Sequence, residues 1–186
     1  MTTLIVIGII VLVVIFFISI YNRLVSLRNN RENAFANIDV QLKQRYDLIP
    51  QLVETVKGYT KHEKETLENI IRLRSAAMGA TTIEGKIQAD NALSSALSGL
   101  KVTLEAYPDL KANQNFLQLQ AEISDIENKL AAVRRFFNSA TKEYNINVQQ
   151  FPASVVAGMF GFHKEPMFEV PEADRAQYEK APEVKF

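Results

Sequence analysis

The sequence predicts an all-α protein, with an N-terminal transmembrane helix followed by an antiparallel four-helix bundle of two long and two shorter helices. Three observations support this fold class. The first 22 residues carry no charged side chain. Apolar residues recur with a helical period through most of the remaining chain. Glycine and proline fall at a few well-separated positions, where they divide this periodic region into helices.

The predicted membrane anchor is the run Leu4 to Ile20, in which 15 of 17 residues are Leu, Ile, Val or Phe. As a helix this run is about 26 Å long, close to the thickness of a bilayer's hydrocarbon core. A core helix of a soluble protein and a cleaved signal peptide are the alternatives. No basic residue precedes the run and no small-x-small cleavage site follows it, so we assign residues 1–22 to a transmembrane anchor.

The distribution of positive charge predicts the orientation of this anchor. Arg23, Arg28 and Arg31 follow the apolar run directly, whereas no Lys or Arg precedes it. Because basic residues favour the cytoplasmic side, we expect a single-pass protein with its N-terminus outside and its bundle in the cytoplasm. The absence of cysteine excludes disulfides, thiolate metal sites and cysteine nucleophiles.

Two segments of the region 23–162 show a heptad pattern typical of packed helices. The first segment has the series Phe35, Leu42, Ile49, Val56 and the series Ile38, Arg45, Leu52, Tyr59. The second has Phe116, Ile123, Leu130, Phe137, Tyr144, Phe151 and Leu119, Ile126, Val133, Ala140. We interpret the aromatic members as core residues of a helical bundle and not as a cofactor site.

The first cytoplasmic helix should continue from the membrane to Lys57, with a kink or restart at Pro50. Gly58 then ends it. Thr60 followed by Glu63 resembles a capping box for a second helix from Lys61 to about Met78.

A third helix is predicted from Ile83 to Ala106, ended by Tyr107 and Pro108. Asp109 is well placed to cap a fourth, very long helix that runs to about Gln150, before Pro152. Short connections make successive helices antiparallel.

The unequal helix lengths predict an uncovered apolar strip. The second and third helices are about 27 to 36 Å long and cannot cover the first and fourth, which are about 55 to 60 Å long. The candidate self-association residues on this strip are Phe35, Ile38, Val133, Phe137 and Tyr144. The alternative is that the Pro50 kink, the returning segment after Phe151 or local packing closes the gap.

The segment from Phe151 to Phe162 is apolar, uncharged and too short to span a membrane. It either docks on the base of the bundle or lies against the bilayer surface. The candidate membrane-contact residues are Phe151, Val155, Val156, Met159, Phe160 and Phe162. Residues 163–186 contain three of the six prolines and are predicted to be a flexible tail that a protein partner could bind.

Composition argues against several functions. The 21 basic and 21 acidic side chains cancel, so no global field attracts nucleic acid. Only His62 and His163 could act as histidine bases or ligands, and the run after His62 lacks the second histidine of a zinc-protease helix. No phosphate-binding loop or nucleophile elbow is present. We therefore assign no catalytic, metal or cofactor residues and predict that the protein is not an enzyme.

Several motifs together resemble those of the bacterial LemA family. They are Tyr21-Asn22, the runs RYDLIP (45–50) and VKGYTKHE (56–63), AYPDLKA (106–112), Tyr144-Asn145, Phe151-Pro152 and Phe160-Gly161-Phe162. The resemblance covers nearly the whole chain to Phe162. One departure is Phe137-Asn138, where the family commonly has Tyr-Asn.

The resemblance implies an anchored helical bundle on the cytoplasmic side of a bacterial inner membrane, with no established reaction. A related branch, the MamQ proteins of magnetosome formation, suggests membrane shaping or scaffolding by analogy. The first functional hypothesis is thus a scaffold that forms homo-oligomers on the lipid bilayer. The second is an adaptor that presents a helical surface, or its tail, to a membrane protease, kinase or other partner.

Overall fold

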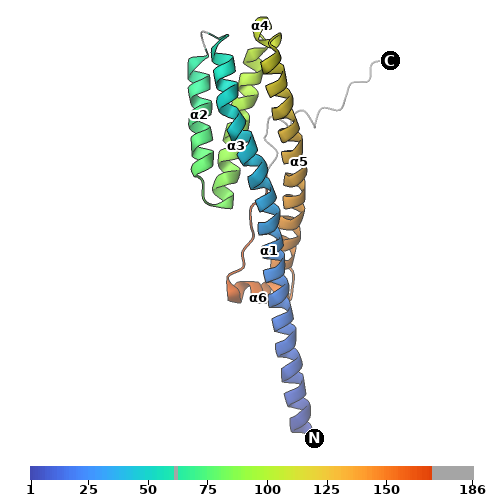
Figure 1. Cartoon of the computed structure of the whole chain (residues 1–186). Coiled ribbons are helices and arrows are strands. Elements are labelled where there is room, and N and C mark those ends of the chain that lie inside the picture. The colour runs from blue at the N-terminus through green and yellow to red at the C-terminus, as the bar shows by residue number, and fades with distance from the viewer. Residues whose placement is uncertain (61–62, 169–186) are drawn as a thin grey trace, which may run out of the picture. The chain divides into compact units, whose positions relative to one another are not determined.

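The computed structural model describes residues 1–60 and 63–168, and every regular element in these ranges is a helix (Figure 1). The helices are α1 (Thr2–Lys57), α2 (Lys64–Gly79), α3 (Ile83–Leu104), α4 (Pro108–Lys111), α5 (Gln114–Gln149) and α6 (Ala153–Phe160). The all-α prediction is therefore confirmed. Most of the predicted tail, residues 169–186, lies outside the described residues, as does His62.

The chain forms two compact units. Unit 1 consists of Met1–Ile38 and Ala132–Met167, and unit 2 of Asp39–Ala131 together with Phe168. Unit 1 thus contains the first part of α1, the second part of α5, and α6. Unit 2 contains the remaining parts of α1 and α5 with α2, α3 and α4, so four-helix packing is confined to unit 2, as the unequal helix lengths predict.

The predicted anchor is the beginning of α1, an uninterrupted helix that ends at Lys57 as expected. In the described part of the chain, α1 is the one helix long and apolar enough to cross a membrane; its most apolar 18-residue window has a mean hydropathy of 3.3. None of that window is buried in the protein. A core helix of a soluble protein does not fit this exposure.

Pro50 lies inside α1, where it removes a backbone donor. A proline lacks the N–H that would bond the carbonyl four residues earlier, here that of Tyr46. Arg74 of α2 supplies the missing bond, because its Nε donates to the Tyr46 carbonyl oxygen over 2.6 Å. Arg74 therefore joins α2 to α1 at the proline, and α1 continues through Pro50.

A buried ion pair joins α1 to α3 in unit 2. The Arg45 Nη2 atom lies 2.9 Å from the Asp90 carboxylate, and both side chains are almost completely buried. Both terminal nitrogens of Arg45 also donate to the Ser94 hydroxyl, over 3.1 and 3.0 Å. Such a pair sets the register of two packed helices more than it adds stability.

The predicted capping box at the start of α2 is wrong. Glu63 is the N-cap residue and makes no side-chain capping bond. Its carboxylate accepts a hydrogen bond from the Tyr107 hydroxyl over 3.4 Å, and the Thr60 hydroxyl donates to the Val56 carbonyl over 3.2 Å. The Thr60 and Glu63 side chains thus bind groups outside α2 and do not cap it.

The predicted cap of the fourth helix is also wrong. Pro108–Lys111 form the separate short helix α4, and α5 begins only after Asn113, whose Oδ1 accepts from the Phe116 amide over 3.0 Å. Asn113, and not Asp109, therefore caps the long helix.

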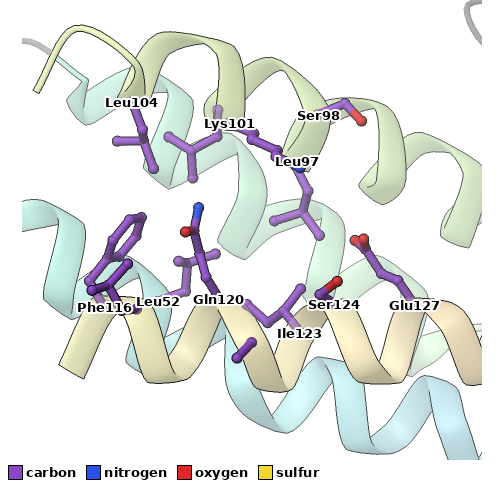
Figure 2. A pocket seen from close by; sticks show the side chains of 13 residues that line it. Leu52, Leu97, Ser98, Lys101, Leu104, Phe116, Gln120, Ile123, Ser124 and Glu127 are labelled. Atoms are coloured by element: carbon purple, nitrogen blue, oxygen red, sulfur yellow. The ribbon is translucent and has the colours of Figure 1, made fainter. Parts of the chain in front are cut away.

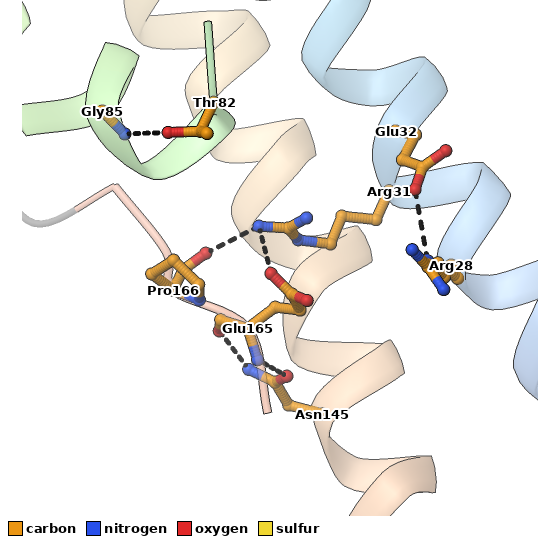
Figure 3. A network of polar contacts seen from close by, with 8 residues as sticks. All are labelled: Arg28, Arg31, Glu32, Thr82, Gly85, Asn145, Glu165 and Pro166. Carbon is orange, nitrogen blue, oxygen red and sulfur yellow. Dashed lines mark hydrogen bonds and ion pairs between the residues drawn. The ribbon is translucent and has the colours of Figure 1, made fainter. Parts of the chain in front are cut away.

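Helix α3 begins where predicted but ends at Leu104, two residues earlier than expected. Thr82 caps it by accepting a hydrogen bond from the Gly85 amide over 3.0 Å, shown in Figure 3. A Cβ atom at position 85 would lie only 2.9 Å from the Thr82 hydroxyl oxygen. Gly85 therefore makes room for the cap.

Candidate membrane-facing surface

Helix α6 follows Pro152 and ends at Gly161, whose left-handed conformation (φ 72°) suits glycine. No residue from 151 to 162 is charged. A helix that is apolar on all sides needs apolar surroundings on all sides. In unit 1, α6 lies across α1, as Figure 1 shows, and the protein covers only one of its faces.

The inner face of α6 packs on the protein. Val156 and Ala157 are buried in a cluster formed with residues of α1 and α5 and with Phe162. The other members of this cluster are Leu24, Leu27, Tyr144 and Val148, with Ile20 and Val25 packed against it. Val156 and Phe162 were predicted to contact the membrane, and this is wrong for both because their side chains are inside unit 1.

The remaining candidate membrane-contact residues are exposed: Phe151 lies just before α6, and Val155, Met159 and Phe160 lie within it. Phe151, Val155, Met159 and Phe160 are 79%, 47%, 71% and 59% exposed. We call these four side chains the α6 outer face. Within the described part of the chain, all four side chains remain exposed to solvent. Their contact with lipid stays a prediction, and their exposure is compatible with it.

Aromatic contacts place α6 beside the end of the apolar run of α1. The Tyr21 ring packs edge-on against Phe160 and Phe162, with ring centroids 4.8 and 5.8 Å apart. Tyr21 directly follows Ile20, the last residue of that run. Aromatic rings of this amphipathic kind are enriched at membrane–water boundaries. The α6 outer face thus lies where α1 would leave the hydrocarbon core.

After α6, residues 161–167 run back along unit 1, and we call them the return segment. The Asn145 side chain binds it through two hydrogen bonds of 2.8 Å, accepting from the Glu165 amide and donating to the Glu165 carbonyl (Figure 3). Arg31 donates to the Pro166 carbonyl over 3.3 Å and lies 3.2 Å from the Glu165 carboxylate. The return segment is therefore fixed to both α1 and α5.

The predicted self-association residues are not an exposed strip. Phe35, Ile38, Phe137 and Tyr144 are buried, and Val133 is half-buried. The Phe35 and Phe137 rings pack edge-on, 5.5 Å apart. The Arg31 guanidinium lies over the Phe137 ring, 5.0 Å from its centroid. The expectation that these side chains lack partners is wrong, because local packing and the Arg31 contact to the return segment close the gap.

Burial shifts the pKa values of Arg31 and Tyr144, two residues that lie near Glu165 of the return segment. Desolvation lowers the pKa of Arg31, and the nearby Glu165 carboxylate acts in the opposite direction. Burial also raises the pKa of Tyr144, and Glu165 adds to that shift. A raised pKa keeps the Tyr144 phenol protonated at neutral pH, and a guanidinium stays charged in proteins, so Arg31 and Glu165 attract each other as an ion pair.

Unit 2 contains a separate groove between α3 and α5. Its volume is about 440 Å³, and Figure 2 shows Leu104 of α3 pointing toward Phe116 of α5, and Leu97 of α3 pointing toward Ile123 of α5. Lys101 and Glu127 also line it. The heptad pattern predicted that Phe116 is a core residue, but it did not predict an open groove here.

No group of three or more metal-ligating side chains lies together among residues 1–60 and 63–168. His163 is exposed at the beginning of the return segment.

Known proteins resemble this chain over most of its length. Protein LemA of Metamycoplasma hominis is 29% identical over 159 residues, which cover 83% of this chain and 71% of the relative. Magnetosome protein MamQ of Magnetospirillum gryphiswaldense is 22% identical, over 83% of this chain and 66% of the relative. Magnetosome protein MamQ 2 of Paramagnetospirillum magneticum is 23% identical, over 80% and 64%. The chain thus spans slightly less than two thirds of each MamQ.

The LemA family model matches residues 34–186. This match includes the second part of α1, all later helices and the return segment. It agrees with the motifs around Pro50 and Pro108 that first indicated the resemblance. The chain belongs to the LemA family.

Proposed function

We propose that this protein is a non-enzymatic helical scaffold that is held on a membrane at two points, by the apolar part of α1 and by the α6 outer face. The observation that carries the proposal is the position of four exposed apolar side chains beside the end of an exposed apolar span. Full burial of a side chain of this size contributes roughly 1.5 to 3 kcal/mol, and each of these four still has about half or more of its surface exposed.

Two attachment points restrict the orientation of unit 1 on the membrane more than one does. A single helix can rotate about its own axis, whereas a second contact beside it fixes the rotation of unit 1 relative to the membrane plane. The return segment strengthens this arrangement, because Asn145 and Arg31 fix the residues that follow α6 to α5 and α1. A scaffold needs such a fixed orientation to present a defined surface.

The location that we propose is the bacterial inner membrane, with the N-terminus outside and the helical units in the cytoplasm. The support is the basic flank after the apolar run and the likeness to relatives named as magnetosome proteins. The chain contains no cysteine, so a cysteine introduced at Thr2 can be labelled specifically. A membrane-impermeant maleimide should label it from outside intact cells; labelling only after lysis would contradict the orientation.

Self-association remains part of this proposal. Confinement to a membrane raises the effective concentration of a weak contact, but the contact must use residues other than the buried set around Phe137. Cross-linking of full-length protein in vesicles at increasing surface density should yield dimers or larger species. Monomers at every density would exclude a self-associating scaffold.

The groove of unit 2 favours a second candidate function, that of an adaptor. Apolar side chains such as Leu97 and Phe116 line this groove together with charged Lys101 and Glu127, a mixture that suits an amphipathic helix of a partner protein. Leu97→Asp should abolish co-purification of such a partner from membranes. Membrane seating and self-association should not change, which separates the adaptor from the scaffold.

Depth-dependent fluorescence quenching tests the two-point attachment. The chain contains no tryptophan, so Phe160→Trp introduces a single reporter on the α6 outer face. In vesicles of phosphatidylcholine with brominated acyl chains, its emission should be strongly quenched. The matched control is Phe136→Trp, an equally exposed phenylalanine on α5 of the same unit, which should not be quenched. Equal quenching of both reporters, or of neither, would contradict the proposal.

A further inference from the structure

Unit 1 contains a small cavity between α1, the end of α5 and the start of α6. Its volume is about 260 Å³, and we call it the interface cavity. Phe16 and Ile20 of α1 line one part of it, together with Phe151. Arg23, Asn147 and Gln150 also line it. Apolar and polar side chains therefore share one cavity.

The order of these residues along α1 matches the order of chemical groups in a phospholipid. Phe16 and Ile20 lie within the apolar run, and Arg23 is the first charged residue after it. From Phe16 to Arg23 the helix rises about 10 Å. A molecule in the cavity would meet hydrocarbon at one end and a guanidinium at the other.

The polar end of the cavity suits an anion. Arg23 is exposed and is the one charged side chain among the described residues that line the cavity. Its guanidinium can donate to phosphate oxygens through two parallel hydrogen bonds. Asn147 is half-buried, and its amide nitrogen donates to the Glu143 carbonyl over 2.9 Å. Because an amide nitrogen has two hydrogens, one is left to donate into the cavity.

We propose that the interface cavity binds one anionic phospholipid, with its phosphate on Arg23 and the Asn147 amide and an acyl chain along Phe16 and Ile20. This inference rests on the proposed membrane seating of α6, because Phe151 belongs both to the α6 outer face and to the cavity. It adds a lipid preference that seating alone does not require.

Phe151→Trp places the single tryptophan of the chain in the cavity and provides the test. Full-length protein is reconstituted in vesicles that contain either brominated phosphatidylglycerol or brominated phosphatidylcholine, each over the same series of mole fractions. One cation at the membrane surface corresponds to about a fivefold preference for the anionic lipid. Half-maximal quenching should therefore need about fivefold less phosphatidylglycerol, and added salt should reduce this difference.

Arg23→Gln in the Phe151→Trp background should make the two lipids quench equally, while the quenching by phosphatidylcholine stays unchanged. The matched control is Arg28→Gln, an exposed arginine of the same helix that pairs with Glu32 and lies outside the cavity. This control should keep the preference.

The possible failures are distinguishable. Equal quenching by both lipids without any substitution, or a preference that survives Arg23→Gln, overturns the anionic-lipid site and leaves the seating of α6 intact. Absence of quenching by either lipid overturns the seating and the site together. If Phe151→Trp reduces the helical content, native mass spectrometry of the unsubstituted chain from mixed-lipid nanodiscs provides the second measurement. It should retain phosphatidylglycerol in preference to phosphatidylcholine, and Arg23→Gln should retain neither selectively.

Discussion

The contact between Arg74 and the Tyr46 carbonyl predicts an energetic coupling with Pro50. Arg74→Met keeps most of the aliphatic stem but removes the donor that replaces the missing helix hydrogen bond. A hydrogen bond to a charged group contributes about 1.5 to 3 kcal/mol. Local opening of α2 should therefore become roughly ten- to a hundredfold more frequent, which hydrogen exchange of peptides from residues 64–79 measures directly.

The coupling follows from a double-mutant cycle. In Pro50→Ala, residue 50 regains an N–H that can bond the Tyr46 carbonyl, so Arg74→Met should then have a much smaller effect. The matched control is Arg72→Met, because the Arg72 guanidinium donates to Asn69 within α2 itself. This substitution should change the free energy of local opening by less than about 0.5 kcal/mol. If Arg74→Met has the same effect with and without Pro50, the proposed role of Arg74 is refuted.

Three further predictions concern unit 1. Phe137→Ala should lower the unfolding free energy in detergent by about 3 to 5 kcal/mol. Phe136→Ala, at the exposed neighbouring residue, should change it by less than about 0.5 kcal/mol. Similar effects of the two substitutions would show that Phe137 is not a buried core residue. Asn145→Ala removes both hydrogen bonds to Glu165, so amide exchange in residues 161–167 should accelerate roughly tenfold or more. Asn147→Ala, which loses only a bond within α5, should leave the exchange of these residues unchanged. Because burial raises the pKa of Tyr144 above its ordinary 10.0, the unfolded state loses the phenolic proton first, and the stability present below pH 10 should be lost as pH rises beyond it. Tyr144→Phe should reduce this alkaline loss in thermal unfolding between pH 9 and 11, and an unchanged pH slope would count against the buried phenol.

The long elements of the fold could be predicted because their signals are long. The apolar run of α1 and the heptads of α1 and α5 extend over many turns, so a few exceptions do not obscure the period. The ion pair between Arg45 and Asp90 was also accessible to sequence reasoning. Arg45 occupies an apolar heptad position. In α3, Ser94 lies seven residues after the apolar Ile87, and Asp90 lies seven residues before the apolar Leu97. A buried charge at one such position requires a polar partner at another.

Other features have no periodic signal. The burial of Phe137 depends partly on Arg31, and Arg31 is held by the return segment, which has no regular structure. Arg74 binds a backbone carbonyl, which every residue possesses, so the side-chain pattern could not identify its partner. All residues of α6 except Ser154 lack a polar side chain. Composition alone could not show which face the protein covers and which one it leaves exposed.

Spin labels at single cysteines on α6 test the central claim, that its outer face lies in lipid, most directly. The cysteine-free chain allows labels at Val155, Val156 and Met159 in turn, in full-length protein reconstituted in vesicles. Labels at 155 and 159 should collide readily with oxygen, which concentrates in lipid, and poorly with a water-soluble nickel complex. The buried position 156 should be protected from both. High nickel accessibility at 155 and 159 would place the outer face in water and contradict the account.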